Sequence, residues 1–282
     1  MFRRAAITGA VTAALTAGAL AGAGAASAGA HVLKARAAGG GLGALIPAHA
    51  GQPLPTHGGT MQSLNWSGYA VTPSSPVTGV SSTFTVPTAG LVPPGFAATW
   101  TGIGGYNSSD LIQAGVSENS LPSNAVFGPQ YYPWIEMLPA AETQISGCSG
   151  DANCTVNPGD RVSVTITNTS GNTWTISLSD AGHWSWSQSF NYASSRNSAE
   201  WILEAPTVVA QTVLANTGTT HFGPPSTYTA GGPTNTIAQG NPTQIVLTPS
   251  PVGLVAEATP SALAADGQSF NDCAYTTSCP AP

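Results

Sequence analysis

The stretch from Val162 to Leu178 reads Val-Ser-Val-Thr-Ile-Thr-Asn-Thr-Ser-Gly-Asn-Thr-Trp-Thr-Ile-Ser-Leu. Apolar side chains alternate with Ser and Thr on both sides of Ser170-Gly171-Asn172. Side chains that alternate with a period of two lie on opposite faces of a strand, and glycine next to asparagine favours a tight turn. The stretch therefore predicts a β-hairpin with one apolar face.

The same kind of pattern continues on both sides of this hairpin. From about Leu64 onward, short apolar runs are separated by Pro, Gly, Asn and Ser, and none has the period of an amphipathic helix. Many short strands with turn residues between them indicate a β-sandwich or barrel. Further strands are predicted at Ser81–Val86, Ala97–Ile103, Gln130–Met137, Glu200–Glu204, Val208–Leu214 and Gln244–Leu247.

The chain begins with a predicted secretion signal, residues 1–28. Met1-Phe2-Arg3-Arg4 is a basic start, Ala5 to Ala21 is an apolar core, and Ala26-Ser27-Ala28 fits a cleavage site. A membrane anchor is disfavoured because this core is rich in Ala, Gly and Thr. Residues 29–62 contain no acidic residue and are rich in Ala, Gly and Pro, which predicts a propeptide or a flexible linker. We expect a secreted, extracellular protein that is not membrane-bound in its mature form, with its main domain at residues 63–282.

The four cysteines lie in two local pairs, Cys148 with Cys154 and Cys273 with Cys279. An exported chain meets oxidising conditions, so two local disulfides are expected, although four cysteines permit three connectivities. A zinc site is disfavoured because no histidine accompanies these spacings. We expect no metal.

Charged residues are few and unevenly distributed. All twelve acidic residues lie at or after Asp110, whereas only Arg161 and Arg196 among the basic residues follow position 36. Such an acidic body excludes nucleic acid as a partner, because phosphate binding needs a basic surface. Repulsion between clustered carboxylates would raise their pKa values in the folded state, so we expect stability to increase as the pH falls.

Two strands each carry a functional polar side chain among apolar or small residues: Gln113 in Leu111–Gly115 and Glu200 in Ala199–Glu204. These stretches follow Asn65-Trp66-Ser67-Gly68-Tyr69-Ala70, Trp100-Thr101-Gly102-Ile103-Gly104-Gly105 and Tyr131-Tyr132-Pro133-Trp134-Ile135-Glu136 in an order that resembles the glutamic peptidases, the eqolisin family G1. The likeness extends from about Asn65 to Pro206. It implies an all-β fold, a concanavalin-like sandwich of two antiparallel sheets with a cleft on one concave face.

The resemblance also implies a mechanism. Glu200 would act as general base and then general acid on a water molecule, and the amide of Gln113 would stabilise the oxyanion. If adjacent strands carry these two residues, both can reach one water, and Gly115 would leave room for the substrate. We expect protein or peptide substrates, hydrolysis in acid, no cofactor and a monomer.

Other site residues follow from the same resemblance. Trp66, Trp100 and Trp134 would line the cleft, although tryptophans in a sandwich are more often part of the core. Glu136 would bind substrate or hydrogen-bond within the cleft, and a surface glutamate is an equal alternative. Glu204 fits a supporting role better than a catalytic one.

Two rival functions stay open at this stage. Trp184 and Trp186 share a strand face and could form a stacking platform of a carbohydrate-binding protein. A glycosidase could use Glu200 with Glu204 or Glu136 as its two carboxylates. His183 and His221 could belong to a serine hydrolase triad, but no nucleophile motif accompanies them. Cleavage of denatured protein in acid would separate a peptidase from a lectin.

Overall fold

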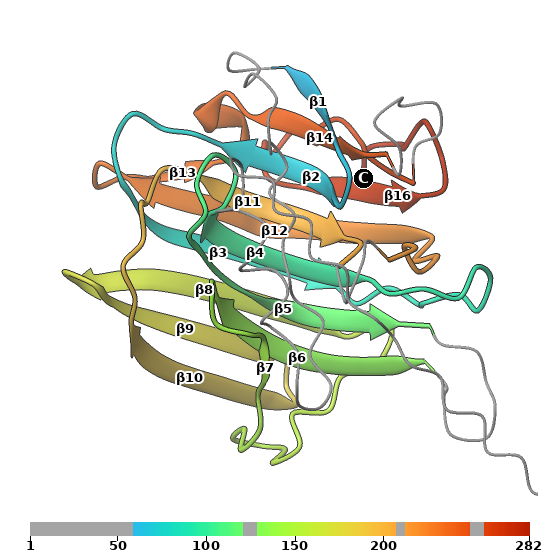
Figure 1. Ribbon diagram of the computed structural model, residues 1–282, viewed down its shortest axis with the longest axis horizontal. Helices are drawn as coiled ribbons and strands as arrows, with labels where there is room; N and C mark the ends of the chain where they lie inside the picture. The colour runs from blue at the N-terminus through green and yellow to red at the C-terminus, as the bar shows by residue number, and fades with distance from the viewer. Residues whose placement is uncertain (1–58, 121–128, 207–211, 249–256) are drawn as a thin grey trace, which may run out of the picture.

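The computed structural model describes residues 59–120, 129–206, 212–248 and 257–282 (Figure 1). The predicted signal peptide and residues 29–58 of the predicted propeptide lie outside the described residues. Residues 60–62, from the end of that predicted segment, form part of the first strand, β1 (Thr60–Ser63). Among the described residues, no helix is long and apolar enough to span a membrane.

The strands form the β-sandwich that the sequence predicts, as two layers that we call the front and back sheets (Figure 1). All strand pairs are antiparallel except β1 with β14. The front sheet has the order β1, β14 (Thr243–Leu247), β2 (Trp66–Val71), β11 (Ala199–Glu204), β4 (Ala98–Gly104), β5 (Leu111–Asn119), β6 (Gln130–Met137) and β7 (Thr143–Gln144). The back sheet has the order β10 (Trp184–Asn191), β9 (Thr173–Asp180), β8 (Arg161–Ser170), β3 (Val77–Thr85), β12 (Thr219–Ala230) and β16 (Phe270–Ala274), with β13 (Thr234–Thr236) beside β12. The short strand β15 (Ala258–Pro260) joins β16 to β14, so the two layers are continuous at one edge.

Most of the predicted strands are present. The hairpin of β8 and β9 pairs Val164 with Leu178 and Ile166 with Ile176, and these apolar side chains are buried. The prediction of a strand at Val208–Leu214 is wrong for its described part, since only Leu214 forms an isolated bridge, with Phe96. That residue packs into a small apolar cluster rather than into a ladder.

The main core fills the space between the two sheets. The front sheet contributes the odd-numbered side chains Tyr69, Ile103 and Trp201 and the even-numbered Ile112 and Val116, while the back sheet contributes Val162, Ile166, Trp174 and Trp184. Because side chains alternate along a strand, the other half of each front-sheet strand faces outward. This outer face carries the predicted site residues.

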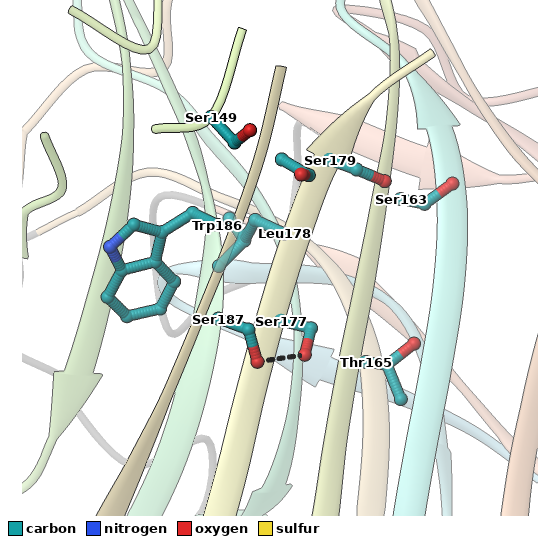
Figure 2. Close-up of a pocket in the computed structure, with 9 residues that line it drawn as sticks. Ser149, Ser163, Thr165, Ser177, Leu178, Ser179, Trp186 and Ser187 are labelled. Atoms are coloured by element: carbon teal, nitrogen blue, oxygen red, sulfur yellow. Dashed lines mark hydrogen bonds between the residues drawn. The ribbon is translucent and has the colours of Figure 1, made fainter. Parts of the chain in front are cut away.

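The outer face of the back sheet is covered with hydroxyl groups. A groove of about 450 Å³ over β8, β9 and β10 is lined mostly by Ser and Thr side chains (Figure 2). Several of these pair across strands, as Ser177 and Ser187 do at 2.8 Å. The predicted two-tryptophan platform is wrong, because Trp184 is buried in the core while Trp186 packs beside Phe190 at the edge.

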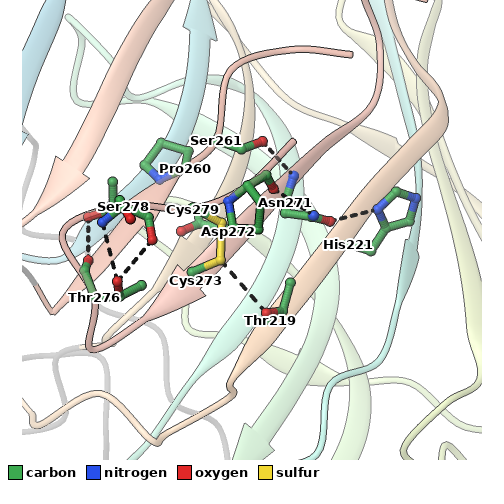
Figure 3. The surroundings of a disulfide bond; sticks show 12 residues. Thr219, His221, Pro260, Ser261, Asn271, Asp272, Cys273, Thr276, Ser278 and Cys279 are labelled. Carbon is green, nitrogen blue, oxygen red and sulfur yellow. Dashed lines mark hydrogen bonds between the residues drawn. A yellow bond between two sulfur atoms is a disulfide. The ribbon is translucent and has the colours of Figure 1, made fainter. Parts of the chain in front are cut away.

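Both local disulfides form. Cys148 and Cys154 close a loop with Cα atoms 5.4 Å apart, and Cys273 and Cys279 do the same at 5.5 Å. The second bridge fixes the C-terminal residues against β16 (Figure 3). The Asn271 amide also donates to the carbonyl of Pro280 at 2.9 Å.

Candidate active site

One row of paired residues crosses the outer face of the front sheet. Glu200 on β11 pairs with Gly102 on β4, Gly102 pairs with Gln113 on β5, and Gln113 pairs with Glu136 on β6. Residues that pair directly across antiparallel strands point to the same face. The sheet thus places Glu200, Gln113 and Glu136 side by side on one surface, which we call the dyad row.

We considered the two catalytic residues on adjacent strands. The structure instead separates them by one strand, β4. Two strand spacings separate their backbones by about 9–10 Å. The residue between them is Gly102, which has no side chain to fill the gap. A Cβ atom at Gly102 would lie 3.0 Å from Cδ1 of Leu111 and 3.1 Å from the Cβ of Gln113. The glycine therefore lets the Leu111 and Gln113 side chains lie close to β4, with Glu200 on its other side.

Gly115 has a different role from the one predicted. A Cβ atom at this position would lie 2.5 Å from the Cβ of Trp100 and 2.2 Å from the carbonyl oxygen of Thr99. The glycine therefore makes room for the neighbouring strand and its tryptophan, and not for a substrate. The glycine that lies within the dyad row is Gly102. It stood in the quoted Trp-Thr-Gly-Ile stretch, but nothing in the pattern of that stretch assigned it a role.

Glu200 is completely buried, and neither of its carboxylate oxygens has a hydrogen-bond partner among the described residues. Loss of hydration raises its pKa well above the ordinary 4.5, and the negative charge of Asp110 raises it further. The Ser198 hydroxyl and the Tyr106 backbone N–H favour the ionised form and offset part of this rise, although neither has the geometry of a hydrogen bond. A buried carboxyl group without partners is costly, and this location is typical of a functional group.

Gln113 is held by Glu136. Its Nε2 donates to Oε2 of Glu136 at 2.6 Å, while its Oε1 has no partner among the described residues. Burial raises the pKa of Glu136 well above 4.5, and the charges of Glu142 and Glu204 add to the rise. Glu136, predicted as a substrate-binding residue, thus contacts the other predicted catalytic residue directly.

The three predicted cleft tryptophans lie on this outer face and not in the core between the sheets. Trp66 and Trp100 pack edge to face with ring centroids 5.0 Å apart, and all three side chains are buried. Glu204 accepts hydrogen bonds from Nε1 of Trp100 at 2.8 Å and from Nδ2 of Asn65 at 3.2 Å. Burial raises the pKa of Glu204 to about 8. Its contacts are those of a residue that fixes Trp100.

The order of side chains along the row does not favour a glycosidase. Glu204 is four residues from Glu200 on the same strand, a backbone separation of about 13 Å, and Glu136 is three strand spacings away, about 14 Å. In a glycosidase the sugar lies between the two carboxyl groups, whereas here the side chain of Gln113 lies between Glu200 and Glu136 and donates to Glu136.

The two histidines have structural partners. His183 Nδ1 lies 2.7 Å from Oδ2 of Asp180, and His221 Nδ1 lies 3.0 Å from Oδ1 of Asn271. Within the described ranges, no hydrogen bond joins a serine hydroxyl to either ring. A serine triad is therefore not assembled from these residues.

Carboxyl groups are also buried outside the dyad row. Glu118 on the inner side of β5 and Asp272 on β16 are fully buried, and desolvation raises the pKa of each well above its ordinary value. We expected raised pKa values from mutual repulsion, but the larger cause in every one of these groups is loss of hydration. Repulsion is secondary and acts mainly on Glu136 and Glu200.

These buried acids predict a protein that is more stable in acid than in base. A carboxyl group with a raised folded pKa binds more protons when folded, so its stabilising effect is complete below the unfolded pKa and is lost as the pH rises through the folded pKa. The window extends from about pH 4, the ordinary range of carboxyl groups, to about 8 for Glu204. As the pH rises through this window, each group that stays protonated in the folded state lowers the free energy of unfolding by about 1.4 kcal/mol per pH unit. We expect the melting temperature to be about 10 °C or more higher at pH 4 than at pH 8.

Amide variants provide the control for this prediction. Glu118→Gln and Asp272→Asn should raise the melting temperature at pH 8 and leave it nearly unchanged at pH 4, since only the charged form is costly. Asp151→Asn should not raise it at pH 8, because hydrogen bonds from Thr155 and Asn153 lower the pKa of that exposed carboxyl. A wild-type protein that melts at a lower temperature at pH 4 than at pH 8 would contradict the prediction.

The chain is similar to known peptidases in sequence and in fold. A family model described as the peptidase A4 family matches residues 64–259, and no curated protein matches the sequence. Among solved structures, scytalido-glutamic peptidase with a transition state analogue inhibitor is similar with a TM-score of 0.56 and 20% identity over 75% of this chain and 98% of that one. Aspergilloglutamic peptidase from Aspergillus niger has a TM-score of 0.53 and 19% identity over 64% and 99%. SCP-B, a member of the eqolisin family in a complex with the tripeptide Ala-Ile-His, has a TM-score of 0.52 and 17% identity over 75% and 98%.

Proposed function

We infer that this chain, which belongs to the peptidase A4 family, hydrolyses peptide bonds with Glu200 as general base and acid and Gln113 as oxyanion donor. Membership of the family makes the chain a glutamic endopeptidase, and the roles of its residues are our proposal. The observation that supports this proposal is the dyad row. The Glu200 carboxylate, which has no hydrogen-bond partner among the described residues, and the Gln113 amide lie on one face of the sheet with Gly102 between them.

The proposed reaction needs only these two side chains and one water. The Glu200 carboxylate removes a proton from water, the water oxygen attacks the peptide carbonyl, and the carbonyl oxygen becomes an oxyanion. Glu200 then returns the proton to the departing amine as the C–N bond breaks. No metal or cofactor takes part in these steps, so chelators should leave turnover unchanged.

Glu136 completes the oxyanion site. One hydrogen of the Gln113 amide is directed to Glu136, which leaves the second hydrogen for the oxyanion. An ionised Glu136 would repel that oxyanion, whereas the raised pKa of Glu136 keeps it protonated in acid. Protonated Glu136 therefore orients Gln113 without adding a competing charge.

We propose that extended protein or peptide chains bind along the outer face of the front sheet. The tripeptide bound to SCP-B and a peptide-based transition state analogue bound to scytalido-glutamic peptidase support this class of ligand. Trp134 has a buried indole N–H without a partner among the described residues. Such a donor is available to a substrate carbonyl, and Trp66 and Trp100 supply apolar surface beside it.

The proposed chemistry requires an ionised Glu200 together with a protonated Glu136. We therefore expect a bell-shaped pH profile whose ascending limb lies above pH 4.5, because the pKa of Glu200 is raised from that value. The descending limb should follow at higher pH, as Glu136 ionises and the buried acids destabilise the fold.

The test is digestion of denatured protein by the secreted enzyme across pH 3 to about 8. We expect cleavage in mild acid, insensitive to chelators and to an inhibitor of paired-aspartate sites, by a product whose N-terminus lies within or after residues 29–62. Glycan binding without proteolysis, or cleavage abolished by a chelator, would contradict the proposed function.

A further inference from the structure

We propose that Asp110 is a positioning residue for Glu200. The carboxylate of Asp110 anchors the segment leading into β11 and lies at the end of the dyad row. This inference rests on the proposed role of Glu200. We call residues 192–198, between β10 and β11, the connector.

The first observation is that the connector is tied to the loop between β4 and β5. Oδ2 of Asp110 accepts a hydrogen bond from the backbone N–H of Ser195 at 2.6 Å, and the hydroxyls of Ser195 and Ser108 lie 3.1 Å apart. The Gly104 N–H donates to the carbonyl of Ser198 at 3.2 Å. Since Ser198 is only two residues before Glu200, these contacts fix the point from which Glu200 enters the sheet.

The second observation places the Asp110 carboxylate itself beside the row. Gly104 lies on the same face of β4 as Gly102, and an ideal Cβ atom at Gly104 would lie 3.1 Å from Oδ2 of Asp110. Gly104 is the diagonal neighbour of Glu200, two residues from its partner Gly102. Diagonal neighbours in a sheet have Cα atoms about 7–8 Å apart. The carboxylate of Asp110 therefore lies beside the backbone of Gly104, close enough to Glu200 for an electrostatic interaction between the two side chains.

The other elements packed around Glu200 contribute few charges. The strands beside it contribute Ala70 from β2 and Gly102 from β4, neither of which titrates. Glu136 lies beyond Gln113 on β6, and Glu204 lies four residues along β11. Tyr106 is neutral in acid, because burial raises its pKa above 10.0. Asp110 is the carboxylate whose charge raises the pKa of Glu200.

Asp110→Asn tests the charge separately from the anchor, because an asparagine oxygen can still accept the Ser195 N–H. We expect the ascending limb of the kcat/KM profile to move to lower pH by about 0.5–1 unit, since removing a negative charge makes Glu200 easier to ionise. The plateau kcat should stay within about threefold. Asp110→Ala should show the same shift together with a lower kcat, and Asp110→Glu should restore the wild-type limb.

Asp151→Asn is the matched control, because Asp151 is also a carboxylate that accepts backbone N–H bonds but lies in the disulfide loop. Its profile should match the wild type. An Asp110→Asn profile that overlays the wild-type curve, with Glu200→Gln inactive, would overturn this inference and leave the proposed function standing. Activity in Glu200→Gln would overturn the proposed function itself.

A second variant covers the case in which Asp110→Asn does not fold. Ser195→Pro removes the backbone N–H that Asp110 accepts and leaves both carboxyl groups in place. With the protein folded, kcat should fall because the connector loses this anchor. An unchanged kcat and pH profile in Ser195→Pro would contradict the inference.

Discussion

Replacing Glu200 by glutamine should abolish peptide hydrolysis while the protein remains folded. The change keeps the size and shape of the side chain but removes its ability to take a proton from water and return it to the amine. Loss of general acid–base catalysis at one group costs up to about 10⁴-fold in turnover, and here the same group serves both steps. The measurement is kcat on a peptide substrate, with the fold checked by circular dichroism.

The stability of this variant should change in the opposite direction from its activity. Glu200 is buried with two partnerless oxygens, so a neutral amide removes the cost of ionising a desolvated carboxyl at neutral pH. The melting temperature of Glu200→Gln at pH 8 should therefore rise. A gain in stability with a loss of function is typical of an active site.

Glu118→Gln is the matched control for this prediction. Glu118 is as deeply buried as Glu200, and its pKa is raised by the same desolvation. It lies on β5 but faces the core, since its neighbour Ser117 shares the face of Gln113. Both variants should gain stability at pH 8, but only Glu200→Gln should lose activity. If both variants lost activity, replacing any buried carboxyl group would be enough to disturb the structure that activity requires. The assignment of Glu200 as the general base would then fail.

The all-β architecture could be predicted because its signals are local. Alternation along β8 and β9 and the turn at Gly171 need no information from distant residues. The strand predicted at Val208–Leu214 is indicated by its apolar and β-branched residues and not by alternation. In the structure, Leu214 is buried in a cluster with Leu203 and Leu247. Tertiary packing there overrides strand propensity.

The arrangement of the site could be predicted only in part. The pattern and the family resemblance singled out Gln113 and Glu200, but strand order decides which residues meet, and it depends on pairings between distant segments. Gly102 acquires its role only because β4 lies between β5 and β11. Asp110 belongs to a loop, and its contact with Ser195 joins positions 85 residues apart. No sequence period reports such a contact.

Replacing Gln113 by alanine should lower kcat by about 100- to 1000-fold, the usual cost of losing one oxyanion donor. The effect should be smaller than that of Glu200→Gln, because the attacking water and its base remain. KM should change less than kcat, since the amide is required most when charge develops on the carbonyl oxygen. Gln130→Ala is the control, because Gln130 is exposed at the start of the neighbouring β6 and pairs with Asn119, away from the dyad row.

Gln113→Glu gives the more demanding test of the same idea. The new carboxyl group keeps the volume of the amide and could occupy the same place beside Glu136. When protonated, it can still donate to the oxyanion, but when ionised it repels the oxyanion and adds a charge next to Glu136. Activity should therefore survive in part at the acid end of the profile and fall more steeply with rising pH than in the wild type. If Gln113→Ala and Gln113→Glu both kept wild-type kcat across the profile, the oxyanion would have to be stabilised by another group, and the dyad row would lose its second member.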